Sequence, residues 1–580
     1  MKKFTLLLFP WLLLFSLFAC DEDKKKETCS VLPARFDADT TLPKGCYLAL
    51  ESPVLAAGVT LTLDPGVKII FSPDTRLAIS GDQSLQAVGT ASDPILLTGE
   101  LAERGSWVGL RFDGTADVGS ALAHVTVEYA GSTASDADSA GIKATADSRG
   151  VTLSLTDSTV RESQGWGLFL TGSALMPAFS GNTLTRNTLG PANVDSQVAG
   201  LLDAASTYAG NDVDEVWVRT GDITRNGTWH ALDVPFHLSG SLDVSIPWTI
   251  EAGNTLILEE EAVVAVSGAE AALHAVGTAD APITFTGAQK TRGFWWSVNL
   301  DGTNHADNRL DFVTFEYGGS TAHDANSACL RMIADSRGVT SGITNSTFRE
   351  CGGYGLYLAG SAVLPGFAGN TLTANTLGPV MSGSTAVHQL DTTSTYTGND
   401  VDEVAVAADW VNANVTWEDL GVPYHLDGGL HVNGTEQNPV VWTLAPGVTL
   451  ILPAAAVLSV AGDYSGLHAV GTVDAPITFT GEEQTAGFWK AIRFDGTLNA
   501  ANALDHVVLE YGGSVGGTGE QGMVHVVSDS HGVAVSITNS TLTHSGLYAI
   551  YLGLWADVNA DLETSNTFSD NASGDVFREE

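Results

Sequence analysis

The chain has 580 residues, of which 44% are hydrophobic, and carries a formal net charge of −41 at pH 7. The apolar content is enough for a large core, while such a charge repels nucleic acid and anionic lipid surfaces and argues against nucleic-acid binding. An anionic polysaccharide would also be repelled unless calcium bridged it. With 63 glycines and many Thr, Val, Asn and Asp residues, the composition is typical of a β-rich protein with frequent turns.

The first 41 residues are typical of an exported protein. Residues 1–19 carry two early lysines and then an apolar run, which predicts a secretory signal peptide. The ending Leu17-Phe18-Ala19-Cys20 resembles a bacterial lipobox, in which the cysteine sulfur carries a diacylglycerol. The resemblance implies lipid attachment at Cys20 and a lipidated tether over residues 20–41. We therefore predict a lipid-anchored protein of the cell envelope, at the outer membrane or the cell surface.

Internal repeats dominate the rest of the chain. Three stretches are near copies of one another, reading LQAVGTASDPILLTG at 85–99, LHAVGTADAPITFTG at 273–287 and LHAVGTVDAPITFTG at 467–481. Such copies indicate an elongated repeat architecture that grows along one axis. Landmarks aligned at offsets of 188 and 194 residues predict three homologous blocks, with bounds at 42–230, 231–420 and 421–580.

Within each block a finer rhythm predicts the local structure. Apolar or alternating runs of three to six residues, such as 60–63 and 151–155, are separated by Gly, Asp, Asn or Pro. These runs are too short for helices and suit strands. A coil of about 22 residues with three strands predicts a parallel β-helix, in which equivalent residues stack on one another. At a rise of ~4.8 Å per coil, the predicted rod is about 100 Å long.

Several motifs resemble the right-handed parallel β-helix proteins of the pectin-lyase-like superfamily. They are Pro65-Gly-Val-Lys-Ile-Ile-Phe71, the Ala-Val-Gly-Thr…Pro-Ile…Thr-Gly units, and Ile343-Thr-Asn-Ser-Thr-Phe348 with the following Gly353-Tyr-Gly-Leu-Tyr357. The predicted fold class is therefore all-β, a right-handed parallel β-helix built from three homologous blocks. This fold hosts lyases, hydrolases, adhesins and plain surface proteins, so the resemblance implies no single activity.

Four cysteines remain after the lipobox, an even number for an oxidising compartment. Cys29 and Cys46 are expected to join the N-terminal segment to the first coil. Cys329 and Cys351 lie 22 residues apart, about one coil, so their sulfur atoms should meet on adjacent coils. We predict two structural disulfides.

Recurring carboxylates and tyrosines are the candidate surface-binding residues. Each block repeats an aspartate, a glutamate and a tyrosine that could line one face and hold cations or sugar hydroxyls: Asp113, Glu128, Tyr129, Asp301, Glu316, Tyr317, Asp495, Glu510 and Tyr511. The alternative is that the acids cap turns and the tyrosines stack. Trp107, Trp295 and Trp489 also recur, and we expect core packing, with a sugar-stacking platform as the alternative.

No catalytic or metal site is predicted. The sequence lacks the Asn-Thr-Asp, Asp-Asp, Gly-His-Gly and Arg-Ile-Lys motifs of polygalacturonase-type relatives, which argues against that activity. The acidic loops at 211–215 and 399–403 lack the full calcium-loop pattern. We expect no cofactor, with calcium left open.

These observations lead to a non-enzymatic, lipid-anchored envelope protein that presents an extended surface for adhesion or glycan binding. We expect a monomer whose partners are the membrane, through its lipid, and a polysaccharide or cell-surface molecule. The alternative is a carbohydrate-active enzyme, a polysaccharide lyase or glycoside hydrolase, working in a groove along one face. One block that departs from its siblings in a cluster of functional residues would favour the enzyme, and a surface without groove or aromatic platform would indicate a spacer.

Overall fold

The computed structural model describes residues 28–580 except 116–118, 135, 137, 146–149, 323, 515–520 and 529–531. The predicted signal peptide, the lipid site at Cys20 and most of the tether therefore lie outside the described residues. The described residues form 63 strands, from β1 (Ser30–Val31) to β63 (Gly574–Arg578). The helices among them are the short segments α1 (Ser196–Ala199), α2 (Leu562–Ser565) and the 3-10 helix η1 (Val387–Gln389).

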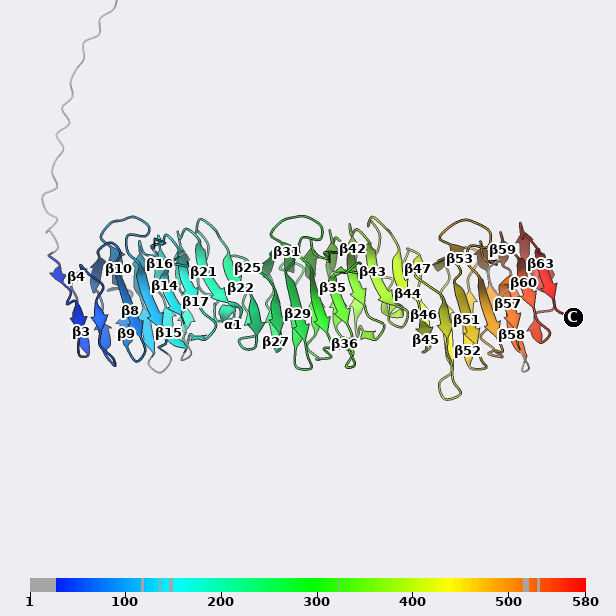
Figure 1. The fold of residues 1–580 in the computed structure, drawn as a ribbon, viewed down its shortest axis with the longest axis horizontal. Coiled ribbons are helices and arrows are strands. Elements are labelled where there is room, and N and C mark those ends of the chain that lie inside the picture. Colours follow the sequence, from blue (N-terminus) through cyan, green and yellow to red (C-terminus); the bar gives the residue numbers. More distant parts are fainter. Residues whose placement is uncertain are drawn as a thin grey trace, which may run out of the picture.

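The strands wind into a single right-handed parallel β-helix, seen as a rod in Figure 1, and the predicted fold class is confirmed. Neighbouring strands of each sheet pair in parallel and belong to successive coils; β10 (Ile95–Gly99), for example, pairs with β13 (Val125–Glu128). Bonds between coils therefore satisfy the backbone along the whole rod.

Two long sheets run through more than one block. The 12-stranded sheet contains β8 (Arg76–Ser80), β11 (Gly109–Asp113), β14 (Ala140–Thr145), β17 (Trp166–Leu170), β21 (Gly190–Asp195), β22 (Val216–Arg219), β25 (Phe236–Leu238), β28 (Thr255–Leu258), β31 (Ile283–Gly287), β34 (Val313–Glu316), β38 (Thr347–Arg349) and β42 (Thr371–Thr373). The 14-stranded sheet contains β23 (Gly221–Ile223), β26 (Leu242–Val244), β29 (Val263–Ser267), β32 (Ser297–Asp301), β35 (Ala328–Ile333), β39 (Tyr354–Leu358), β43 (Gly378–Gly383), β44 (Val404–Ala407), β47 (Tyr424–Leu426), β50 (Thr449–Leu452), β53 (Ile477–Gly481), β56 (Val507–Glu510), β59 (Thr541–Thr543) and β62 (Thr567–Ser569).

Shorter sheets complete the sides of the coils. The first seven-stranded sheet contains β1, β4 (Cys46–Ala49), β7 (Lys68–Phe71), β10, β13, β16 (Thr159–Arg161) and β20 (Thr183–Thr185). The last contains β45 (Trp410–Val411), β48 (Leu430–Val432), β51 (Val457–Ala461), β54 (Ala491–Asp495), β57 (Gly522–Val527), β60 (Tyr548–Leu552) and β63. The remaining sides run from β3 (Thr40–Leu42) to β18 (Ala174–Leu175), from β24 (Thr228–Trp229) to β41 (Phe367–Ala368) and from β46 (Val415–Trp417) to β61 (Ala556–Val558).

Each of the first two blocks spans seven coils and one further side of a coil. On the 12-stranded sheet, seven steps lead from β8 to β28, and the next strand along the chain is β29, the counterpart of β8 at an offset of 187 residues. Seven steps on the 14-stranded sheet likewise lead from β29 to β50, followed by β51, the next counterpart. Equivalent strands of successive blocks therefore belong to different sheets.

The twist of the sheets brings equivalent sides back into line. A shift by one side of the coil rotates a block by about a third of a turn about the rod axis. A sheet twist of about 16° per coil cancels that rotation over seven coils, and such a twist lies in the range usual for β-sheets. Figure 1 shows the result, because the loops that follow β10, β31 and β53 all rise on its upper edge. Equivalent surfaces thus recur along one side of the rod, about 35 Å apart at ~4.8 Å per coil.

The core is a set of stacked apolar ladders. Strand residues alternate between the inside and the outside, as in β6 (Thr60–Leu63), where both leucines are buried. Trp107, Trp295 and Trp489 are fully buried, and each indole N–H donates to the backbone carbonyl of the recurring glutamate of its block, 2.9 Å away. The expected core packing of these tryptophans is confirmed.

Both predicted disulfides are formed. Cys29 and Cys46 have Cα atoms 4.5 Å apart, and Cys329 and Cys351 have theirs 5.8 Å apart at a sequence separation of 22. The predicted coil length of about 22 residues is too short for much of the chain, however. Side-chain bonds between adjacent coils span 24 residues from Ser163 to Asn187 but 33 from Val125 to Ser158, since loops lengthen many coils.

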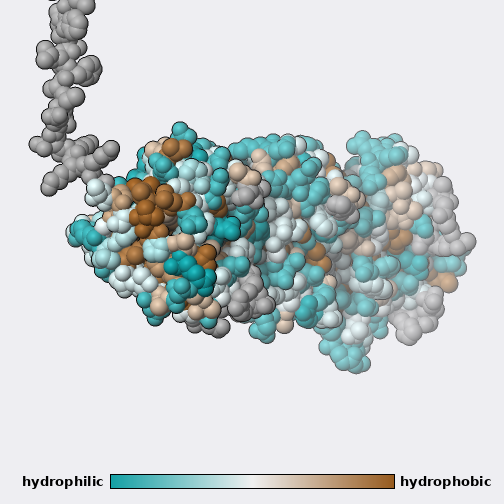
Figure 2. All heavy atoms as spheres, turned by 60° about the vertical axis from the view of Figure 1, so that its left-hand side comes forward, coloured by the Kyte–Doolittle hydropathy of each residue, from teal (hydrophilic) through white to brown (hydrophobic). Residues whose placement is uncertain are grey.

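The N-terminal end of the rod carries an apolar patch. Figure 2 turns this end forward and shows hydrophobic residues gathered there, and Val31, Leu50 and Val54 of this region are each more than half exposed. The first coils have a neighbour on one side only, so side chains that other coils would cover remain in contact with solvent.

Candidate functional site

The recurring glutamates of the first two blocks are held inside the molecule. Glu128 is 8% exposed, accepts a bond from Thr98 (3.0 Å), and receives Nε and Nη2 of Arg161 on its other oxygen (2.9 and 2.7 Å). Glu316 has the same environment, with Thr286 and Arg349 as partners. These ion pairs link adjacent coils and leave little of either carboxylate for a ligand.

The third block lacks this arginine. Glu510 still accepts a bond from Thr480 (2.8 Å), but Thr543 stands at the position of Arg161 and Arg349. The Thr543 hydroxyl contacts His544 and Ser569 instead (2.9 and 2.8 Å). Glu510 is therefore half-buried and more open than its two counterparts.

The aspartates and tyrosines of the predicted set lie elsewhere on the coil. Asp113 ends β11 on the 12-stranded sheet, whereas Glu128 ends β13 on a different side, and the other blocks repeat this separation. The tyrosines occupy the bend after the glutamate with φ near +60°, a strained conformation for a bulky residue: Tyr129, Tyr317 and Tyr511. The structure thus keeps glutamate and tyrosine adjacent but places the aspartates on another side. A binding role for the set stays a prediction.

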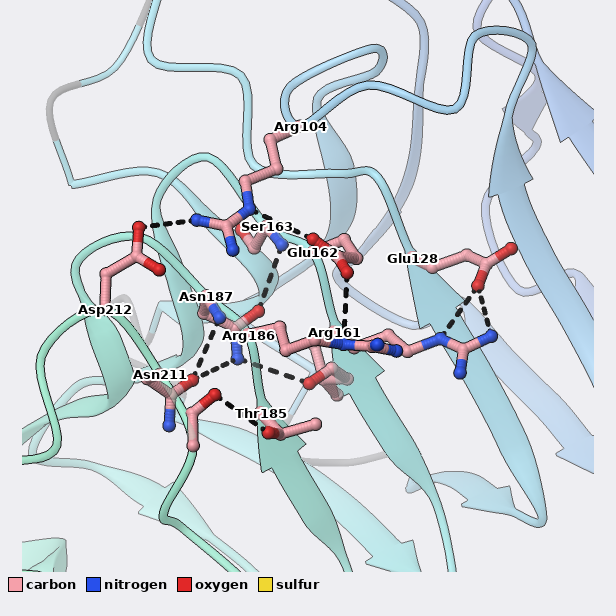
Figure 3. A network of polar contacts seen from close by, with 12 residues as sticks. Arg104, Glu128, Arg161, Glu162, Ser163, Thr185, Arg186, Asn187, Asn211 and Asp212 are labelled. Carbon is pink, nitrogen blue, oxygen red and sulfur yellow. Dashed lines mark hydrogen bonds and ion pairs between the residues drawn. The ribbon is translucent and has the colours of Figure 1, made fainter.

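The acidic loops are engaged in internal contacts. Figure 3 shows Arg104, from the loop after β10, between Glu162 (3.1 Å) and Asp212 of the first acidic loop (2.6 Å). Glu215 of the same loop contacts His237 (2.6 Å). Asn187 and Asn211 form an asparagine ladder beside this network, in which the Asn211 amide oxygen accepts from the Asn187 backbone. These loops therefore fasten coils together.

Neither a metal-binding cluster nor a membrane-spanning helix is found among the described residues. In the part of the chain that the structure describes, no group of three or more His, Cys, Asp or Glu residues is placed to hold a metal ion. Within those same residues, no helix is both long and apolar enough to span a bilayer.

A groove opens at the junction between the second and third blocks. It has a volume of about 790 Å³ and crosses four successive coils, so it is about 14 Å long at the ordinary rise. We call it the junction groove, and its lining residues are Gly360, Ser361, Gly383, Ser384, Thr385, Ala407, Asp409, Trp410, Asn412 and Asn433. Its volume lies in the range of sites that take organic ligands.

Trp410 is the main apolar surface of the junction groove. It begins β45, points outward and is 45% exposed, while the next residue, Val411, is buried. The imidazole of His431 lies beside the Trp410 ring, with ring centroids 4.9 Å apart. The Ser384 hydroxyl donates to the backbone carbonyl of Trp410 (3.1 Å). Such contacts restrain the indole as a ready platform.

The preceding junction shows why this groove is open. There Arg219 donates to Asp195 (2.6 Å) and to the carbonyl of Leu170 (2.6 Å), and Arg225 donates to the carbonyl of Gly172. At the next junction, 188 residues later, the counterparts of both arginines and of the aspartate are Ala407, Ala413 and Gly383. Loss of three long polar side chains leaves the space empty.

The floor of the groove is fixed by two glycines. Gly383 approaches Gly360 so closely that a Cβ on Gly383 would lie 2.5 Å from the Gly360 Cα. Asp409 and Trp410 replace Gly221 and Asp222 of the earlier junction, and Asn412 and Asn433 replace a threonine and a serine. The sequence analysis named a departing block only as a mark of the enzyme alternative and did not locate this one. Aligning residues 219–225 with 407–413 would have revealed this site.

The comparisons with known proteins agree with the fold. Residues 35–148 match the family model described as a pectate-lyase like beta helix domain. This match begins shortly before the first block, covers about half of that block and includes none of the junction groove. The comparison with curated proteins gave no match. The comparison with solved structures gave none either.

Proposed function

We propose that this protein is a glycan-binding β-helix of the cell envelope that acts without catalysis, with the junction groove as its binding site. The observation that carries the proposal is the exposed Trp410 in a groove that exists only because the arginines of the preceding junction are replaced. An indole face takes the apolar face of a sugar ring, while amide, hydroxyl and carboxylate groups bond its hydroxyls. Asp409, Asn412 and Asn433 supply those groups.

The composition of the groove supports binding over hydrolysis. Of its ten lining residues, Asp409 alone carries a carboxylate, whereas most glycoside hydrolases use two carboxyl groups on either side of the scissile bond. The alternative, a carbohydrate-active enzyme, shares the β-helix fold and predicts product release from a polysaccharide.

The first experiment is a titration of oligosaccharides by calorimetry. Trp410→Ala is expected to weaken binding roughly thirtyfold, because a central aromatic anchor contributes about 2 kcal/mol or more. Ala407→Arg places the side chain of the earlier junction into the groove and should block binding. Ala265→Arg is the matched control, since Ala265 lies half-buried on β29 of the same sheet, five coils before β44.

The second experiment separates binding from catalysis. The purified protein is incubated with a broad polysaccharide panel, and reducing ends and unsaturated products are measured. We expect neither to form. Product release that is lost in Trp410→Ala would replace the binding function with the enzyme alternative, and binding that is unaffected by Ala407→Arg would move the site elsewhere.

The lipid anchor is a separate part of the proposal. Two disulfides are typical of a protein that folds outside the reducing cytosol, and the lipobox-like ending at Cys20 supports lipidation. Metabolic labelling with a fatty acid should mark the native chain and should fail for Cys20→Ser. An unlabelled native chain would refute the anchor and leave the groove proposal intact.

A further inference from the structure

The junction groove has a charge as well as a shape. Its ten lining residues include Asp409 and no lysine or arginine, and the nearby Asp427 carboxylate accepts a bond from the backbone of Ala408 (2.7 Å). The chain as a whole carries a formal net charge of −41 at pH 7. A ligand in the groove therefore meets a negative field, which raises the local concentration of cations and repels carboxylates.

The earlier junction shows what fills an equivalent space inside this same chain. Both occupants are guanidinium groups, which donate to backbone carbonyls and to Asp195. In the junction groove the counterpart of Gly172 is Gly360, whose carbonyl accepts from the Thr385 hydroxyl, and Asp409 supplies a carboxylate at the rim. The groove thus presents a carboxylate to a cationic donor, while the two guanidinium groups of the earlier junction have no counterpart there.

Trp410 favours the same kind of ligand. An indole face attracts an ammonium group through its quadrupole in addition to packing against a sugar ring. Asn412 and Asn433 can each donate and accept, so they tolerate ring hydroxyls in either direction. A uronate would place its charge against Asp409 with no basic partner among the lining residues.

We infer that the junction groove selects glycans that carry free amino groups, such as partly or fully deacetylated hexosamine chains, over neutral glycans and over polyuronates. This inference rests on the proposed glycan-binding function and names its ligand class. It differs from what a pectate-lyase like fold alone would suggest, because polyuronates are excluded by the charge of this site.

The test compares three oligosaccharides of equal length at pH 6: a glucosamine oligomer, its N-acetylated form and an oligogalacturonate. Calorimetry on the wild-type protein should rank the glucosamine oligomer first by up to about fivefold and the oligogalacturonate last, as expected for one surface charge pair. Asp409→Asn should remove most of that preference, because it should weaken binding of the glucosamine oligomer more than binding of the acetylated oligomer. Higher salt should weaken only the glucosamine oligomer.

The outcomes separate the two proposals. If the acetylated and free-amine oligomers bind equally, and both depend on Trp410, the inference fails while the glycan-binding function stands. Tighter uronate binding than glucosamine binding overturns the inference in the same way. If no oligomer binds, or if the preference survives Ala407→Arg, the junction groove is not the site and both proposals fall.

Discussion

Replacing Arg349 with threonine reproduces in the second block what the third block has by nature. Glu316 is 6% exposed and holds two N–H donors of Arg349 on one oxygen. Hydrogen bonds to charged groups contribute about 1.5–3 kcal/mol when a partner is left buried. The Arg349 side chain is about half exposed, so water compensates part of the loss and we expect about 2 kcal/mol.

The loss should be local, because each coil of a solenoid contacts mainly its neighbours. Native-state hydrogen exchange of β34 and β38 should therefore accelerate about 30-fold, the equivalent of 2 kcal/mol. Adding Glu316→Gln to Arg349→Thr should restore at least half of the protection, since the buried charge is then removed. The reverse substitution, Thr543→Arg in the third block, should add the missing ion pair with Glu510 and slow hydrogen exchange in β56 and β59.

Unchanged exchange in β34 and β38 after Arg349→Thr would refute the reasoning, because the ion pair would then contribute nothing between coils. Equal losses in the single and double variants would show that the uncompensated carboxylate is not the cause. In either case the arginine would act through packing of its aliphatic stem.

Two further predictions concern the disulfide between Cys329 and Cys351 and the histidine His425. Cys329→Ser with Cys351→Ser should destabilise the second block by about 3 kcal/mol for a loop of 22 residues, measured as a lower denaturation midpoint of that block. Burial lowers the pKa of His425, but its contacts with Glu482 and Glu403 outweigh burial and leave the pKa raised. Protonated His425 therefore stabilises the fold fully below pH ~6.5, and this stabilisation is lost as the pH rises through its raised pKa. The melting temperature should fall from pH 6 to 8, and His425→Gln should make this fall smaller. An identical fall in the variant would exclude His425 as the cause.

The fold was predictable because its signals repeat. Alternating runs, stacked asparagines and near-identical segments specify strands, bends and coils many times over. Both cysteine pairs were predicted correctly, and coil spacing identified the pair Cys329–Cys351. The length of individual coils was not predictable, since loops such as 100–106 add residues without a fixed rhythm. The offset of one side per block also escaped, because a sequence shows register along the chain but not rotation about an axis.

The candidate site was harder to predict from the sequence, because its residues do not repeat. Attention to residues that recur led to Glu128 and Glu316, and their recurrence marks internal ion pairs between the coils of the first two blocks. Trp410 and Asp409 do not recur, so a search for repeats passes over them. A functional residue in a repeat protein stands out where a structural residue of the sister block, such as Arg219, is replaced by a small one.

The offset of one side per block limits how this chain can change in length. Gain or loss of a whole block moves everything beyond it by about 35 Å without turning it, so any surface presented to a partner keeps its heading. Loss of one strand with its bend would instead swing the remaining rod by about a third of a revolution and aim its groove away from the original direction. Variants of different reach are therefore expected to differ by entire blocks, and a designer who wants a longer reach should duplicate at that unit.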